Sequence, residues 1–138
     1  MEATMASSGK EDLGPEDFRC LKILGKGSFG HVYLVQKVDE PDTQKNQYAM
    51  KILPKKKLYD HNLVRYAMTE KHIMSVVDHP FIIKMRFTFE TQDKLYFILD
   101  YCPGGDLSEY LNIERSFTEK KARFYVAEIL LAIEELHT

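Results

Sequence analysis

The chain has 138 residues, of which 44% are hydrophobic, 29% charged and 12% aromatic, and its formal net charge is −2. This composition is typical of a globular domain or part of one, and it excludes collagen-like, disordered and disulfide-scaffold proteins. The near-neutral charge provides no single-sign field that would attract nucleic acid or an anionic membrane, so we expect neither partner.

The first fourteen residues, 1–14, are small and polar and lack the apolar run of a signal peptide. We expect a disordered tail there. No apolar run approaches the ~20 residues needed to cross a bilayer. Cys20 and Cys102 form no C-x-x-C pair and no His is placed to complete a zinc site, which favours reduced thiols and a cytoplasmic protein, with a nuclear location also open.

Residues 18–101 carry the signals of five strands interrupted by one helix. Strand-like segments cover residues 18–24, 31–38, 47–53, 81–89 and 94–101, and a glycine-rich turn joins the first two into a hairpin. Lysines at 55–57 read as a solvated loop, with a nuclear-localisation or nucleic-acid patch as the alternative. From Leu63 the apolar positions 63, 66, 67, 73, 74 and 77 predict an amphipathic helix that ends near Pro80.

Residues 102–138 predict two further helices. Asp106 can cap a short helix through Leu111, and Thr118 can cap a longer one that reaches Leu136. Apolar residues cover most of the circumference of the last helix, which is typical of a buried helix. The predicted fold class is therefore α+β: a five-stranded antiparallel sheet with one long packed helix, followed by two more helices.

Two charged residues occupy apolar positions. By strand alternation Lys51 shares a face with Ala49 and Leu53, and Glu70 lies in the middle of the apolar stripe of the following helix. An unpaired buried charge costs several kcal/mol, so we expect Lys51 and Glu70 to meet, strand to helix. A purely structural ion pair remains one interpretation and a functional pair the other.

The glycine-rich turn, Gly25 to Gly30, favours the functional interpretation. Glycines let main-chain N–H groups approach a phosphate closely, and Gly30 permits the turn back into the second strand. A dinucleotide-binding loop would need a helix directly after the glycines, and a Walker loop would end in G-K-[ST]. The chain has a strand there and reads Gly30-His31-Val32, so neither applies.

Taken together, these motifs resemble a eukaryotic protein kinase, specifically the ATP-binding N-terminal lobe of a serine/threonine kinase of the AGC group (the group named after protein kinases A, G and C). The signature G-x-G-x-x-G-x-V matches residues 25–32, the strand lysine motif matches 48–51, and the helix glutamate is Glu70. Further similar segments are 79–82, 95–101, 104–107, 117–119 and 122–125. The resemblance runs from about Phe18 to Thr138.

The resemblance implies ATP as the ligand, with Lys51 and Glu70 as catalytic residues. Amides of the turn would cover the phosphates, Phe29 would shield them, and Lys51 would hold the α- and β-phosphates. The other implied roles are a roof over adenine, main-chain hydrogen bonds to the base, a gatekeeper position and a ribose contact. The full implied set is Leu24, Gly25, Lys26, Gly27, Ser28, Phe29, Gly30, Val32, Ala49, Lys51, Leu99, Asp100, Cys102 and Asp106. Asp106 serves equally well as a simple helix cap.

A docking pocket is also implied, because kinases of this group receive an aromatic motif of a C-terminal tail between the glutamate helix and the sheet. The matching positions are Lys55, Leu58, Val64, Met68 and Leu95. From the residues alone, these positions are simply core and rim of a helix–sheet contact.

The expected activity is transfer of the ATP γ-phosphoryl group to serine or threonine of a protein substrate, with residues 15–101 as the N-lobe and 102–138 as the hinge end and start of the second lobe. The 138 residues contain no H-R-D or D-F-G motif. We therefore expect the chain alone to be inactive and the Mg²⁺ ligands to lie elsewhere. A non-catalytic nucleotide-binding or docking module stays open as an alternative, as does a non-kinase phosphate binder if Lys51 and Glu70 prove unpaired.

Overall fold

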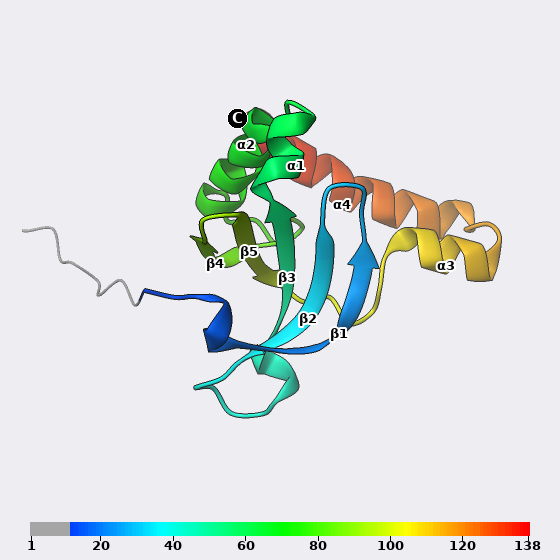
Figure 1. Cartoon of the computed structure of the whole chain (residues 1–138). Helices are drawn as coiled ribbons and strands as arrows, with labels where there is room; N and C mark the ends of the chain where they lie inside the picture. Colours follow the sequence, from blue (N-terminus) through cyan, green and yellow to red (C-terminus); the bar gives the residue numbers. More distant parts are fainter. Residues whose placement is uncertain (1–11) are drawn as a thin grey trace, which may run out of the picture.

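A computed structural model describes residues 12–138, whose centre is one five-stranded sheet (Figure 1). All neighbouring strands are antiparallel and the spatial order is β1-β2-β3-β5-β4. The strands are β1 (Phe18–Lys26), β2 (His31–Lys37), β3 (Gln47–Pro54), β4 (Met85–Glu90) and β5 (Lys94–Asp100). The predicted α+β class and the five-stranded antiparallel sheet are confirmed.

Four α-helices accompany the sheet in the described residues. α1 (Lys55–Asp60) and α2 (Val64–Val76) lie between β3 and β4 in the chain, whereas α3 (Leu107–Glu114) and α4 (Glu119–His137) follow β5 and extend to one side of the sheet (Figure 1). Short 3-10 turns, η1 (Pro15–Asp17) and η2 (Gln44–Asn46), precede β1 and β3. No helix among residues 12–138 has the length and hydropathy needed to cross a membrane.

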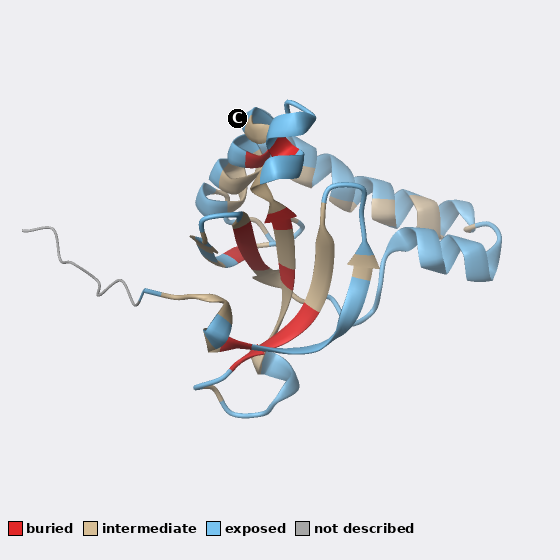
Figure 2. Cartoon of the chain, viewed as in Figure 1, coloured by how far each residue is buried: buried red, intermediate tan, exposed pale blue. Residues whose placement is uncertain are grey.

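Each face of the sheet has its own hydrophobic core, since alternate residues of a strand point to opposite faces. The core toward α1 and α2 consists of Leu53, Leu58, Ala67, Met85, Leu95 and Phe97. The core on the other face consists of Phe18, Val35, Met50, Tyr96 and Ile98, with more aromatic rings packed around it. The buried residues of β3 and β5 form the middle of the molecule (Figure 2).

A β-bulge in β4 redirects its side chains. Met85 pairs with Leu99 and Phe87 with Ile98, so Arg86 has no partner in the β4–β5 ladder. One extra residue inverts the alternation that follows it. As a result Met85 joins the helix-side core, while Phe87 packs against the aromatic core on the opposite face.

Three local expectations are wrong. The lysines at 55–57 begin helix α1 instead of a loop, because lysine is a good helix former and Leu58 anchors the helix in the core. The fourth strand starts at Met85 instead of residue 81, because the N–H groups of Phe81 and Ile82 are bonded within a turn to His79. Tyr66, placed on the apolar face of the helix, is 70% exposed.

The predicted helix caps are both present. Asp106 Oδ1 accepts from the N–H of Glu109 at 2.8 Å, and Thr118 Oγ1 accepts from the N–H of Lys121 at 3.3 Å. The last helix has the apolar circumference typical of a buried helix, yet in the described chain neither α3 nor α4 has a buried residue (Figure 2). Of the predicted tail, residues 1–11 lie outside the described residues, and Gly14 N–H donates to Asp17 Oδ2 at 2.7 Å.

Candidate functional site

Lys51 and Glu70 form the ion pair that the sequence predicts. The Nζ atom of Lys51, in the middle of β3, lies 2.8 Å from Oε1 of Glu70 on α2. Their side chains are 30% and 39% exposed, so both charges still reach solvent. A pair this accessible contributes little to stability. The arrangement therefore leaves a positioned cation that an anionic ligand can reach.

The glycine-rich turn between β1 and β2 is closed by a hydrogen bond from Gly27 N–H to the carbonyl of Gly30 at 2.8 Å. A Cβ on Gly30 would lie 2.0 Å from the carbonyl oxygen of Ile52, so this glycine is required by the close approach of β2 and β3. A Cβ on Gly25 would meet nothing within 4 Å. The fold leaves open space at Gly25, as a closely approaching ligand would need.

A pocket of about 380 Å³ lies between this turn, β3 and the α1–α2 region. Six residues of the predicted ATP set line it together with Glu70: Gly27, Ser28, Phe29, Gly30, Val32 and Lys51. The remaining lining is apolar except for the tyrosine hydroxyl, and it comes from Leu53, Leu58, Leu63, Tyr66 and Ala67. Four of the six residues of the glycine-rich turn thus lie in one pocket with Lys51, whereas Gly25 and Lys26 do not line it.

Phe29, at the tip of the turn, contacts a residue that the sequence analysis missed. Its ring meets the ring of His61, just after α1, edge to face at a centroid distance of 5.4 Å. His61 Nδ1 is also 2.9 Å from the carbonyl oxygen of Lys57. The turn therefore rests against the α1–α2 junction and closes one side of the pocket.

The predicted adenine half is less enclosed than the phosphate half. Ala49 pairs with Leu99 across β3 and β5, and Leu99 packs against the helix-side core. Leu24 sits at a bulge of β1 and is 38% exposed, and Cys102 is exposed beyond β5. None of Leu24, Gly25, Lys26, Ala49, Leu99, Asp100, Cys102 and Asp106 lines the pocket that contains Lys51. The residues predicted to contact adenine thus lie mostly outside the pocket that contains Lys51.

Open space at Gly25 and the cation of Lys51 suit a phosphate chain. Within residues 12–138, no group of three or more His, Cys, Asp or Glu side chains is placed to hold a metal ion.

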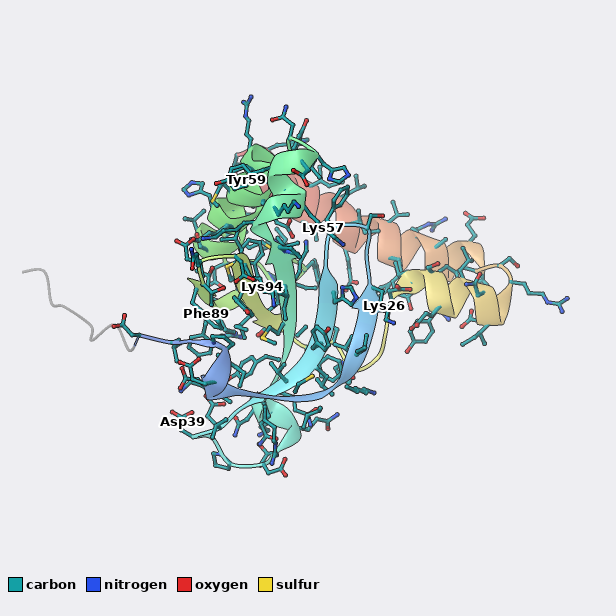
Figure 3. The ribbon with its side chains drawn as sticks, viewed as in Figure 1. Lys26, Asp39, Lys57, Tyr59, Phe89 and Lys94 are labelled. Carbon is teal, nitrogen blue, oxygen red and sulfur yellow. The ribbon has the colours of Figure 1, made fainter. Side chains whose placement is uncertain are left out.

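A second, smaller pocket brings together the five residues predicted for docking. It has a volume of about 80 Å³ and is lined by Lys55, Leu58, Tyr59, Val64, Met68, Glu90 and Leu95. Lys55 Nζ lies 2.6 Å from Glu90 Oε2 at its rim, and this hydrogen bond lowers the pKa of Glu90. Tyr59 and Glu90 were not part of the prediction. Figure 3 shows Tyr59 on α1, at the opposite end of the molecule from Asp39 in the β2–β3 connection.

Arg86 makes a further contact that the sequence does not predict. Its guanidinium engages both carboxylate oxygens of Asp100, the last residue of β5, and this hydrogen bonding raises the pKa of Arg86. The alternation of polar and apolar residues in β4 gives no signal for this contact, since it depends on the bulge.

Comparison with known proteins decides the family, because residues 18–138 match the protein kinase domain. The chain belongs to the protein kinase family. Its similar proteins include a RAC family serine/threonine-protein kinase homolog of Dictyostelium discoideum, 46% identical over 127 residues, or 92% of this chain. Ribosomal protein S6 kinase alpha-1 of Homo sapiens is 46% identical over 131 residues, or 95% of this chain.

The match identifies the sheet and α2 as a kinase N-lobe and confirms the resemblance to AGC serine/threonine kinases. The ion pair at 2.8 Å joins Lys51 and Glu70, the two residues that the sequence predicts as the signature lysine and glutamate. The chain spans 28% of the length of the Dictyostelium protein and 18% of the human one.

Proposed function

We propose that this chain provides the ATP-binding portion of a protein serine/threonine kinase that transfers the γ-phosphoryl group of ATP to a protein hydroxyl. The observation that carries the proposal is the Lys51–Glu70 pair at 2.8 Å beneath the glycine-rich turn. The similarity to a RAC family serine/threonine-protein kinase homolog supports serine or threonine as the acceptor.

Each part of the site has a physical task in this proposal. Main-chain N–H groups of residues 28–30 donate to phosphate oxygens, since the N–H of Gly27 is used to close the turn, and Phe29 keeps water from the phosphates. Lys51 neutralises charge on the α- and β-phosphates, while Glu70 holds its ammonium in place. Adenine is covered by Leu24, Val32 and Ala49. Main-chain groups of Asp100 and Cys102 form hydrogen bonds with the base, and Leu99 limits access behind it. Asp106 contacts the ribose in addition to capping α3.

We further propose that the 138-residue chain binds nucleotide weakly and transfers no phosphate by itself. The sequence holds no H-R-D or D-F-G motif, so the chain lacks the catalytic aspartate and the metal ligands of the kinase mechanism. Mg²⁺ would neutralise charge on the phosphates, and its protein ligands would lie outside this sequence. The alternative function, a non-catalytic nucleotide-binding or docking module, differs only in what the whole protein does with the bound nucleotide.

Removing the Lys51 ammonium tests the ATP site. We expect Lys51→Ala to weaken ATP binding by about tenfold or more, because the main charge-assisted contact to phosphate is lost. NMR titration with Mg·ATP measures this, since amide signals of Gly27 and Gly30 report millimolar affinities. Lys56→Ala, which removes an exposed lysine of α1, is the matched control. Equal affinity of Lys51→Ala and wild type would contradict the site.

Two assays of the wild-type chain test the remaining parts of the proposal. Incubation with labelled ATP and a protein substrate should give no phosphorylated product, and product formation would refute the expected inactivity. Calorimetric binding of ATP at micromolar or tighter affinity would likewise refute the expected weak binding.

We also propose that the smaller pocket docks an aromatic segment, as the family resemblance implies. Buried Leu58 and Leu95 form its floor, and Met68 lies on its exposed rim. A phenylalanine-containing peptide should bind at this pocket, and Met68→Glu should weaken its binding by about tenfold, because a carboxylate would line an apolar surface. Fluorescence polarisation measures the change, with Thr69→Glu on the same helix as control. If the peptide bound Met68→Glu as tightly as wild type, the proposed docking role of this pocket would be wrong.

A further inference from the structure

The guanidinium of Arg86 makes a bidentate contact with the carboxylate of Asp100. Its Nε donates to Oδ1 at 2.6 Å and its Nη2 donates to Oδ2 at 3.1 Å. The β4 bulge makes this geometry available, because Arg86 is the residue that has no partner on β5. Bulges commonly re-aim a side chain in this way. A lysine cannot reproduce the two-pronged contact.

Asp100 is also held through its main chain. Its N–H donates to the carbonyl of Lys84 at 3.0 Å, and it pairs with Tyr48 of β3 in the sheet. Beyond Asp100 the strand ends, and Cys102 is exposed in the segment that leads to α3. Asp100 is therefore the last residue of β5 that the sheet holds before the chain leaves it.

We propose that Arg86 is a positioning residue for adenine recognition: by holding the Asp100 carboxylate, it sets the orientation of the Asp100 main chain that bonds the base. This inference rests on the ATP binding proposed above. Arg86 acts through Asp100 and has no contact with the nucleotide. If the ion pair were only structural, its loss would lower stability. Any effect on affinity would then be equal for a ligand with a base and a ligand without one.

Comparing a ligand that has a base with one that lacks it separates these two roles. Wild type, Arg86→Ala, Arg86→Lys and Asp100→Asn are titrated with ATP and with inorganic tripolyphosphate, and the amide signals of Gly27, Gly30 and Cys102 are followed by NMR. Lys84→Ala is the matched control, because it removes a neighbouring ion pair with Asp78 and keeps the main-chain bond to Asp100. A thermal melt of each variant checks folding.

Both Arg86 variants should weaken ATP binding by about threefold to fivefold, the effect that a half-exposed bidentate pair can carry, and leave tripolyphosphate binding unchanged. Asp100→Asn should cause a similar loss, and the Arg86→Ala/Asp100→Asn double variant should lose no more than either single one. Lys84→Ala should change neither ligand.

Unchanged ATP affinity in folded Arg86→Lys overturns the inference, and so does an equal loss for ATP and tripolyphosphate. Additive losses in the double variant also overturn it, because Arg86 would then act by a route other than Asp100. If wild type binds no ATP, the proposed function fails and this inference fails with it. That result differs from a failure at Arg86 alone.

Discussion

Gly25 and Gly30 belong to one turn, yet the structure demands only one of them for folding. A side chain at Gly30 would collide with the carbonyl of Ile52, whereas a side chain at Gly25 would point into open space. Neither has a positive φ. Packing therefore does not require glycine at position 25, and in the proposed function a phosphate chain approaches the backbone there.

Alanine at these two positions should separate folding from binding. Gly30→Ala should lower the free energy of unfolding by about 1–3 kcal/mol, because the new Cβ forces β2 and β3 apart. Gly25→Ala should change it by no more than about 0.5 kcal/mol while weakening ATP binding. Chemical denaturation and an NMR titration measure the two effects. A destabilised Gly25→Ala with intact ATP binding would show that this assignment of roles is reversed.

At the scale of elements, the short helix α1 is joined to the end of β4 by the Lys55–Glu90 ion pair. The same pair lies at the rim of the smaller pocket. The hydrogen bond from Lys55 lowers the pKa of the Glu90 carboxyl below its ordinary value of 4.5. The ionised form is therefore favoured in the folded chain, and the pair links the stability of this corner to pH.

The lowered pKa of Glu90 determines how the stability of the folded chain changes with pH. A carboxyl whose folded pKa is depressed contributes stability above its unfolded pKa and loses it as the pH falls through the folded value. Glu90→Gln should therefore melt about 1–3 °C below wild type at pH 7, and this difference should be smaller near pH 3, where the Glu90 carboxyl takes up its proton more readily. Thermal melts at both pH values measure this, with the exposed Glu134→Gln as control. A difference that persists undiminished near pH 3 would mean that the pair is not its cause.

At the scale of the whole molecule, the described chain has two parts: a sheet with a hydrophobic core on each face, and the helices α3 and α4, which have no hydrophobic core of their own. α3 and α4 contain no buried residue, although α4 has apolar residues on most sides. Phe124 and Leu130 are 60% and 59% exposed. Large exposed apolar patches favour association with other surfaces.

We therefore expect the 138-residue chain to self-associate through α4. Sedimentation velocity should show an apparent mass that rises with concentration, and the double variant Phe124→Glu/Leu130→Glu should remain near 16.1 kDa. Lys120→Glu, which alters charge on the same helix, should behave like wild type. A monomeric wild type at the concentrations used for NMR would exclude association through this face.

Much of this architecture follows from the sequence alone, because its signals are local. Strand alternation, helical spacing and the capping residues Asp106 and Thr118 predict the order and type of most elements, and the apolar setting of Lys51 and Glu70 predicts their pairing. The glycine-rich turn and these two charges together indicate the kinase family. None of these inferences needs knowledge of which strands become neighbours.

The tertiary structure alone decides what depends on distant partners. The bulge at Arg86 exists only relative to β5, so the bond to Asp100 and the move of Phe87 to the aromatic core have no signal in the β4 sequence. The contact of Phe29 with His61 likewise joins two turns that are far apart in the chain. The physical reason is that alternation describes one strand, whereas register and side-chain contacts arise when two segments meet.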